Sequence, residues 1–525
     1  MKTRLLLLLL IVCGFAKAQT IVVGGPQTGV WDADTVRVTE DVKVVDSLVI
    51  APGTVVLFEK FWSIIVADGA SLKALGAPED SVVFTIADTT GFHVYNSGLG
   101  GWNGFQCKKA GKVLLDYCVL QYGKAADTLD RLGGALYFLD CSDVEITHTT
   151  LRCNFSREFG GAIFARDSKL MFSDCCISDN SVYTLDGTYA MYGGGACFQK
   201  CDVEMTGMEF RDNYGPTCIG GALSLDSCAV RIDRCTFINN IGLNGGGLYL
   251  MRSMDKECRF SNLLFDDNYS GHFGGGFALM DVSPEIYNVL VINNRSEGVS
   301  CNGIFFYGHS SPRLTNCIVY GNYPLEMGSI ADTTQMWAWT TDGFAPEFYH
   351  CLIEGGLRYI HSGDLIQVFE DVIDTDPLFV DAECHDFRLG EGSPCRDAGD
   401  EKTPSSITDG LDLAGMPRVL NDRIDMGPYE YSGASVGHFE ASVPFARLIG
   451  NPLNGQSHIE LNLKTEKEIV MAIYSLTGNR VARRSFCLDG SDRLEIGSLV
   501  EHLAPGLYVI EIAVDGKVCT LKAVR

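Results

Sequence analysis

Aspartates recur at regular intervals in the middle of this 525-residue chain, each directly before an asparagine. If successive repeats stack about 4.8 Å apart, as neighbouring strands do, such carboxylates form a column that suits a calcium ion or paired acid–base groups. A solvated column without a ligand is the alternative, because carboxylates this close repel one another unless they are neutralised. The candidate calcium ligands are Asp179, Asp212 and Asp267.

Aromatic residues lie in register beside these aspartates. Tyr214, Tyr269 and Tyr323 each follow an asparagine of the repeat, and Trp337 and Trp339 lie in a later insertion. Exposed rings in register form a platform for sugars, because the C–H faces of a pyranose pack on aromatic rings. We predict that these five residues bind a polysaccharide or a cell-surface glycan; packing of loops against the body of the protein is the alternative.

Enzymatic chemistry has weaker support. A lyase needs a basic residue to remove a proton next to a uronate carboxylate, and a cation to neutralise that carboxylate. His272 and Arg295 are available, but no motif selects either of them. Glycan binding or adhesion is therefore the first hypothesis, and a calcium-dependent polysaccharide lyase or a glycoside hydrolase is the alternative.

Cysteines recur at one position of the repeat, which favours a stack of buried thiols, since a buried thiol behaves as a small apolar group. Disulfides are the alternative, and a metal site is disfavoured because the chain has no Cys-x-x-Cys pair. The recurring cysteines are Cys118, Cys175, Cys235, Cys317 and Cys351.

The repeat that would position these side chains has two markers. A Gly-Gly pair opens each unit except the last, which opens with Asn302-Gly303, and the second glycines are 26 to 34 residues apart from Gly134 to Gly303. An apolar residue, two others and then Asn follow each opening, from Leu151–Asn154 to Val319–Asn322. About 27 residues with short alternating strands correspond to one coil of a right-handed parallel β-helix. Paired glycines suit a coil corner, and stacked asparagines suit a hydrogen-bonded ladder.

The net charge of the chain restricts the kinds of molecule that it can bind. The net charge is −25, and residues 440–525 are neutral, so the whole excess of negative charge lies before residue 440. A body this acidic repels phosphate groups, and we expect no nucleic-acid partner.

The first 18 residues have the features of a signal peptide, with Lys2 and Arg4, an apolar run and Ala16-Lys17-Ala18. No other stretch approaches about 18 apolar residues, so we expect no transmembrane helix.

The Gly-Gly and Asn repeat resembles right-handed β-helix proteins of the pectate-lyase-like superfamily and the repeats of polymorphic outer-membrane proteins. Polygalacturonase-like motifs occur only as fragments, in Asp266-Asp267, Gly308-His309-Ser310 and Arg231-Ile232-Asp233. Downstream, Asp376-Pro377-Leu378 through Asp425-Met426-Gly427 resembles a choice-of-anchor segment.

The C-terminal 85 residues resemble another family. Three motifs resemble those of the C-terminal sorting domain of the type IX secretion system: Asn451-Pro452-Leu453-Asn454-Gly455, Thr477-Gly478 and Pro505-Gly506. This resemblance implies contact with the type IX machinery, export across the outer membrane, and a location at the cell surface or outside the cell.

The expected architecture is all-β, a right-handed parallel β-helix followed by a small immunoglobulin-like β-sandwich. The predicted segments are a signal peptide (1–18), N-terminal coils (19–124), Gly-Gly/Asn repeats (125–325), C-terminal coils with the choice-of-anchor-like segment (326–431), a linker (432–440) and the sorting domain (441–525).

Overall fold

A computed structural model describes most of the chain. The described residues are 19–126, 132–183, 191–297, 301–323, 334–362, 365–421 and 423–432, followed by parts of 446–524 that are mainly strands. The signal-peptide prediction and nearly all of the predicted linker lie outside them.

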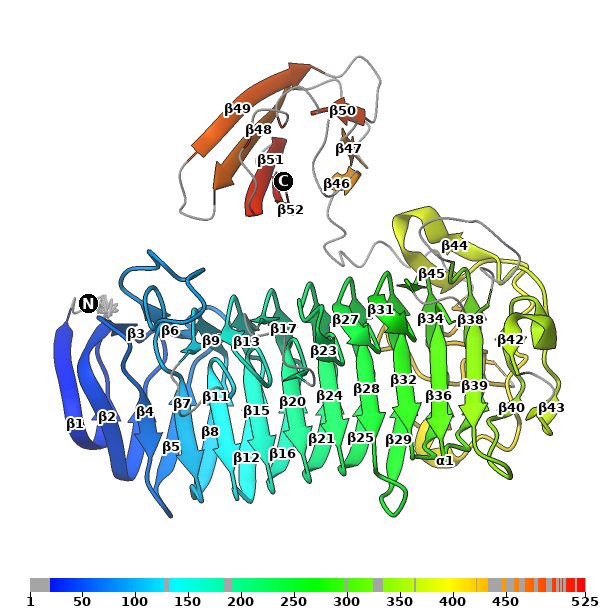
Figure 1. The fold of residues 1–525 in the computed structure, drawn as a ribbon, viewed down its shortest axis with the longest axis horizontal. Helices are drawn as coiled ribbons and strands as arrows, with labels where there is room; N and C mark the ends of the chain where they lie inside the picture. The colour runs from blue at the N-terminus through cyan, green and yellow to red at the C-terminus, as the bar shows by residue number, and fades with distance from the viewer. Residues whose placement is uncertain are drawn as a thin grey trace, which may run out of the picture.

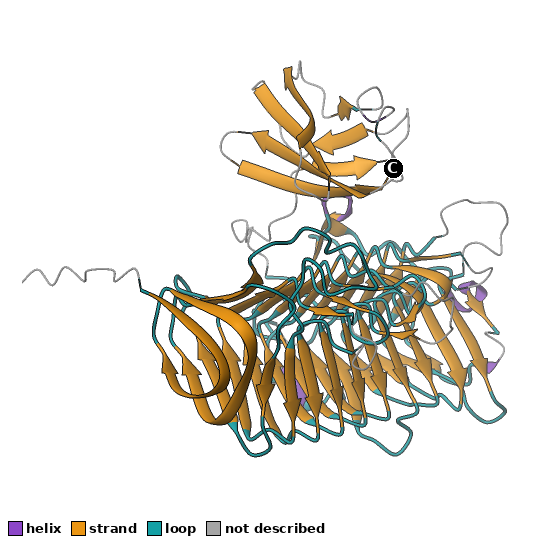
Figure 2. Cartoon of the chain, turned by 60° about the vertical axis from the view of Figure 1, so that its left-hand side comes forward, coloured by secondary structure: helices purple, strands orange, loops and turns teal. Residues whose placement is uncertain are grey.

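Residues 20–373 form an elongated solenoid of parallel strands, which confirms the β-helix prediction (Figure 1). Each strand pairs in parallel with the equivalent strands of the coils before and after it, as in the row Val144, Leu170 and Val203. The long strands β1 (Thr20–Trp31) and β2 (Thr35–Ile50) begin the stack and bend around it (Figure 2).

Three long sheets make the walls of the solenoid, named here the first, second and third sheets. The first contains β4 (Ile64–Val66), β7 (Phe105–Lys108), β11 (Leu136–Leu139), β15 (Ile163–Arg166), β20 (Ala196–Gln199), β24 (Leu223–Asp226), β28 (Leu248–Met251), β32 (Phe277–Met280), β36 (Ile304–Gly308), β39 (Met336–Thr340) and β42 (Ile360–His361). The second contains β5 (Ser71–Leu75), β8 (Lys112–Asp116), β12 (Asp143–Thr147), β16 (Lys169–Ser173), β21 (Asp202–Thr206), β25 (Ala229–Asp233), β29 (Cys258–Ser261), β33 (Glu285–Tyr287), β37 (Arg313–Thr315), β40 (Glu347–Tyr349) and β43 (Phe369–Glu370). The third contains β3 (Val55–Phe58), β6 (Val82–Ile86), β9 (Cys118–Gln121), β13 (Thr150–Arg152), β17 (Cys176–Ser178), β22 (Glu209–Arg211), β26 (Thr236–Ile238), β30 (Leu264–Asp266), β34 (Leu290–Ile292), β38 (Ile318–Tyr320) and β41 (Leu352–Ile353).

Short strands after the third sheet form a ridge along the solenoid, named here the ridge sheet. They belong to two short sheets, which isolated bridges of Tyr214 to Ser181 and to Ile241 join into one ridge. The strands are β10 (Lys124–Ala125), β14 (Phe155–Ser156) and β18 (Ser181–Val182), and then β19 (Met191–Tyr192), β23 (Cys218–Ile219), β27 (Ile241–Asn244), β31 (Tyr269–Phe273) and β35 (Arg295–Ser296). In β14, β18, β27, β31 and β35 the strand begins directly after an asparagine of the ladder, and Tyr269 is the first residue of β31.

Alternation of side chains explains why these short sequences form the walls. In β16, Leu170 and Phe172 point inward and are buried, whereas Lys169 and Met171 are exposed. Successive residues of a strand point to opposite faces, so one apolar residue in two suffices to fill the core. The interior also contains a stack of parallel rings, Phe210, Phe237 and Phe265, with centroids 4.8 and 4.6 Å apart.

The predicted asparagine ladder is present and buried. The Asn213 side chain donates to the Asn240 Oδ1 at 2.9 Å, and the Asn240 side chain donates to the Asn268 Oδ1 at 2.9 Å. Each Oδ1 also accepts the backbone N–H of the preceding ladder residue, so every coil is tied to the next twice. The ladder contains Asn154, Asn180, Asn213, Asn240, Asn268, Asn294 and Asn322, and it ends on Gln335.

The glycine pairs occupy corners, for two separate reasons. Gly160 has a φ of 61°, a backbone conformation that favours glycine. Gly161 is needed for space, because a Cβ there would lie 2.1 Å from the carbonyl oxygen of Gly194 in the next coil. The same two roles recur at Gly220 and Gly221.

The recurring cysteines form the predicted column of buried thiols. All five are buried, and none of them is in a disulfide. The column also joins neighbouring coils, since the backbone N–H of Met208 donates to the Cys235 Sγ and that of Cys317 donates to the Cys351 Sγ. Burial raises the pKa of Cys118 and of Cys175 to about 12.

Residues 374–431 fold along the outside of the last coils. The hairpin of β44 (Phe379–Asp381) and β45 (Asp386–Leu389) and the short helix α1 (Ser405–Thr408) belong to this segment. Its apolar residues cover outward-facing side chains of the third sheet, among them Leu290 and Ile318. Asn288 donates to the carbonyls of Asp425 and Gly427, which ties the segment to the solenoid.

The C-terminal domain consists of two antiparallel sheets. One contains β46 (Ala446–Ile449), β47 (His458–Leu461) and β50 (Arg493–Glu495), and the other contains β48 (Glu468–Ser475), β49 (Arg480–Cys487), β51 (Leu507–Val514) and β52 (Lys517–Val524). β51 and β52 pair as an antiparallel hairpin in which Val514 is opposite Lys517. The immunoglobulin-like topology stays a prediction.

Candidate functional site

The structure places two of the predicted tyrosines in one row along the solenoid. Tyr214 bridges to Ile241 of β27, which pairs in turn with Tyr269 of β31, so the two tyrosines lie two coils apart on the ridge. Tyr323 follows the last asparagine of the ladder. We name this set, Tyr214, Tyr269 and Tyr323, the tyrosine column.

The three rings differ in exposure. Tyr214 is 47% exposed, whereas Tyr269 and Tyr323 are half-buried. The Tyr323 hydroxyl donates to the Glu354 carboxylate. Burial raises the pKa of Tyr269, and a hydrogen bond with Glu297 raises it further. Each ring therefore presents part of its surface to solvent, and two of them have a carboxylate at the hydroxyl.

Further rings extend this surface in a way that the repeat did not predict. Phe155, which follows Asn154, is buried because Tyr95 stacks on it with ring centroids 4.7 Å apart. Tyr95 also contacts Tyr183 at 5.2 Å between centroids. Burial raises the pKa of Tyr95, and the nearby hydroxyls of Tyr214 and Tyr183 raise it further. Tyr95, Tyr183 and Tyr214 thus form one continuous half-exposed cluster.

The predicted aspartates occupy the turn just before the ladder. Their backbone φ values are 60° at Asp179, 56° at Asp212 and 55° at Asp267, and Asp and Asn tolerate this left-handed conformation best after glycine. The residue type therefore has a conformational cause in addition to any binding role.

Neighbouring side chains compensate two of these three carboxylates. Asp212 accepts hydrogen bonds from Asn239 at 2.7 Å and from Arg211 at 3.1 Å. Asp267 forms an ion pair with Arg295. Within the described ranges, no group of three or more His, Cys, Asp or Glu side chains is arranged to hold a metal ion.

The two tryptophans lie on a different wall. Both point outward from β39 in the first sheet, and their rings stack with centroids 5.1 Å apart. Trp339 is 53% exposed and meets Tyr307 of the preceding coil edge to face. Trp337 is half-buried against Phe305 and Phe273. The site predicted from sequence is therefore two surfaces: the tyrosine column and the tryptophan pair.

The residues considered for catalysis do not converge. Asp266 is buried and contacts His385, His309 contacts Asp281, and Arg231 pairs with Glu257. These three contacts lie on the third, first and second sheets or their turns, respectively.

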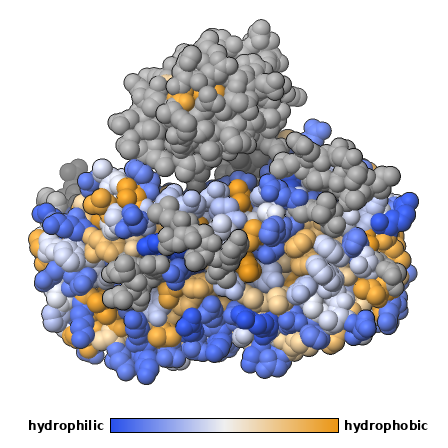
Figure 3. All heavy atoms as spheres, in the orientation of Figure 1, coloured by the Kyte–Doolittle hydropathy of each residue, from blue (hydrophilic) through white to orange (hydrophobic). Residues whose placement is uncertain are grey.

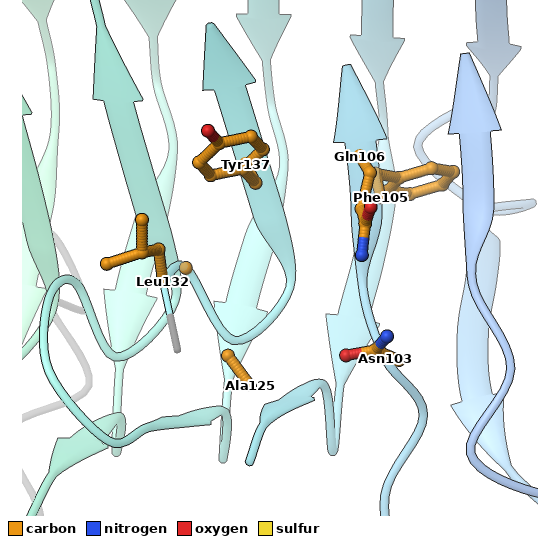
Figure 4. A pocket seen from close by; sticks show the side chains of 7 residues that line it. Asn103, Phe105, Gln106, Ala125, Leu132 and Tyr137 are labelled. Carbon is orange, nitrogen blue, oxygen red and sulfur yellow. The ribbon is translucent and has the colours of Figure 1, made fainter. Parts of the chain in front are cut away.

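A shallow hollow with a cavity volume of only about 10 Å³, little more than the room for one water molecule, lies near the start of the first sheet (Figure 4). Among its lining residues only Tyr137 is titratable, and none of the predicted site residues borders it. The lining consists of Asn103, Phe105, Gln106, Ala125, Leu132, Gly133 and Tyr137.

Comparisons with known families define the class of protein. Residues 87–286 match the family described as a right-handed beta helix region, and residues 449–524 match the secretion system C-terminal sorting domain. No curated protein matches the chain. Taken with the solenoid of parallel strands, these matches make the chain a right-handed β-helix protein that carries a type IX secretion sorting domain.

This class fixes where the protein acts. The sorting domain indicates contact with the secretion machinery and export across the outer membrane to the cell surface or the extracellular space. In the part of the chain that the structure describes, no helix is long and apolar enough to cross a membrane.

Proposed function

We propose that this exported β-helix is a glycan-binding or adhesive protein and that the tyrosine column is its main binding surface. The observation that carries the proposal is the row of partly exposed rings on the ridge sheet, with carboxylates beside it. Aromatic rings offer the flat apolar surface that a pyranose face requires, and carboxylates accept hydrogen bonds from sugar hydroxyls.

Electrostatics favours neutral sugars. Asp212, Glu297 and Glu354 lie on or beside the column. A uronate or sulfate group placed among these carboxylates would be repelled, whereas a neutral hexose would not. The overall charge of −25 acts in the same direction.

The tryptophan pair is a second contact surface in this proposal. Trp339 presents more than half of its side chain to solvent, and Tyr307, which is 37% exposed, widens the apolar surface beside it. On the face of the solenoid shown in Figure 3, apolar patches alternate with hydrophilic side chains, which suits contact with a sugar chain that has both apolar faces and hydroxyls.

A polysaccharide panel tests this function against the enzymatic alternative. The purified protein is incubated with neutral and acidic polysaccharides, and both retention of the protein and release of new reducing or unsaturated ends are measured. Retention on a neutral polysaccharide without new ends supports glycan binding. New ends would establish the lyase or hydrolase, and no retention on any polysaccharide would refute the proposal.

A further inference from the structure

A buried lysine holds a loop against the ridge. Lys124 of β10 is fully buried, and its ammonium donates to the carbonyl oxygens of Gly91 at 3.3 Å, Val94 at 3.0 Å and Leu99 at 2.9 Å. The same ammonium lies 5.3 Å from the ring centroid of Phe92. A protonated amine has three N–H groups, and here each meets one carbonyl.

This loop carries Tyr95. Because Gly91, Val94 and Leu99 surround Tyr95 in sequence, the three contacts of Lys124 fix the part of the chain that places its ring on Phe155. The turns Gly91–Val94 and Val94–Ser97 are also closed by backbone hydrogen bonds of 2.9 and 3.2 Å. Tyr95 therefore stands at the position in the row that buried Phe155 would otherwise occupy.

The resulting row has a regular period. An aromatic ring lies at this position on every second coil: Tyr95 over Phe155, then Tyr214, Tyr269 and Tyr323. The coils between them carry Ser181, Ile241 and Arg295 at the same position. Two coils span about 9.6 Å, twice the spacing of neighbouring strands. A flat β-1,4-linked chain turns the same face to a surface every second sugar, and its disaccharide repeat is close to this spacing.

We infer that the Lys124-clamped loop supplies Tyr95 as the first contact of an extended site, in which a linear neutral 1,4-linked glycan chain lies along the solenoid axis on alternate coils. This inference rests on the proposed function. It adds a residue, Tyr95, that no repeat marker predicts, and it makes Lys124 a positioning residue. From the Phe155 coil to the Tyr323 coil the row spans six coil spacings, about 29 Å, which matches roughly a hexasaccharide.

Binding of cellobiose and cellohexaose, measured by calorimetry, tests the inference. Tyr95→Ala is expected to weaken cellohexaose binding about fivefold, the effect of one aromatic contact, and to leave cellobiose binding on the tyrosine column unchanged. Lys124→Met, which keeps an unbranched apolar chain of four heavy atoms but makes no hydrogen bonds, should have the same effect and should increase hydrogen exchange in peptides covering residues 91–99. Tyr349→Ala, on the outside of the second sheet, is the matched control and should bind as the wild type does.

The outcomes separate the two proposals. If Tyr214→Ala weakens binding but Tyr95→Ala and Lys124→Met do not, the extended site is wrong and the proposed function stands. If both variants weaken cellobiose and cellohexaose equally, the loop is only structural and the inference is also wrong. If the wild type binds neither sugar, the inference fails; retention on another polysaccharide would leave the proposed function in place.

Discussion

Replacing Asn240 by Leu tests how much the asparagine ladder stabilises the solenoid. The Asn240 side chain makes four hydrogen bonds: its Nδ2 donates to Phe210 at 3.0 Å and to Asn268 at 2.9 Å, and its Oδ1 accepts the backbone N–H of Asn213 at 3.1 Å and the Nδ2 of Asn213 at 2.9 Å. Leucine has a similar size and makes none of them. Asn240 is fully buried, so water cannot replace the lost partners.

The expected loss follows from these contacts. A hydrogen bond contributes about 1 kcal/mol net, and a buried group left without a partner costs about 1–3 kcal/mol. Asn240→Leu removes four hydrogen bonds, about 4 kcal/mol in all, and one buried group left without a partner raises the expected loss to about 5–7 kcal/mol.

Urea unfolding followed by tryptophan fluorescence provides the assay, with the shift in midpoint as the readout, since a long repeat array need not unfold in two states. Asn239→Gly is the matched control: it removes one exposed hydrogen bond to Asp212 from the same turn and relieves a φ of 53°. Its midpoint should move little. A shift for Asn240→Leu no larger than that of the control would refute the argument that the ladder amides hold the coils together.

Three further predictions concern export, the thiols and the lysine clamp. Deleting residues 441–525 should leave the β-helix in the periplasm, because the match to the sorting domain lies within that region; surface display of the truncated protein, detected by protease shaving, would contradict this. The thiols of Cys118 and Cys175 should resist alkylation in the native protein and react in urea, because burial raises the pKa of each to about 12; rapid native labelling, mapped by peptide mass, would show that the column is accessible. Burial lowers the pKa of Lys124 to about 8, whereas an exposed lysine titrates near about 10.4. Between these two pH values the open loop binds more protons than the closed loop. Raising the pH therefore favours the closed loop. Exchange protection of residues 91–99, corrected for intrinsic rates, should therefore rise up to about 25-fold from pH 7 to pH 9.5, and the protection in Lys124→Met should not depend on pH. A fall in protection of the wild type with rising pH would contradict the lowered pKa of Lys124.

Much of the solenoid could be predicted from sequence because its constraints repeat. Asn213 and Asn240 occupy the same place in successive coils, so one steric and hydrogen-bonding rule applies at each and leaves a periodic signal. The buried thiols at Cys235 and Cys317 were predictable for the same reason. The tyrosine column follows from this register, since Tyr214 and Tyr269 each stand next to a ladder asparagine.

The rest depends on contacts that occur once. Tyr95 meets Phe155 through a loop whose conformation is set by Lys124, and no repeat marker relates these three positions. Residues 374–431 likewise reach back to earlier coils, as in the contact of His385 with Asp266. Such long-range contacts follow from the shape of a particular loop, and a single sequence carries no periodic signal for them.

The central claim is that the tyrosine column binds a glycan, and the double variant Tyr214→Ala/Tyr269→Ala tests it most directly. Calorimetric titration of the wild type and the variant with the neutral polysaccharide that retains the wild type should show a loss of about 1–3 kcal/mol of binding free energy. The melting temperature should change little, because Tyr214 is 47% exposed and Tyr269 is half-buried. Unchanged binding by the double variant, or its unfolding, would contradict the account, since the rings would then be packing elements and the binding surface would lie elsewhere.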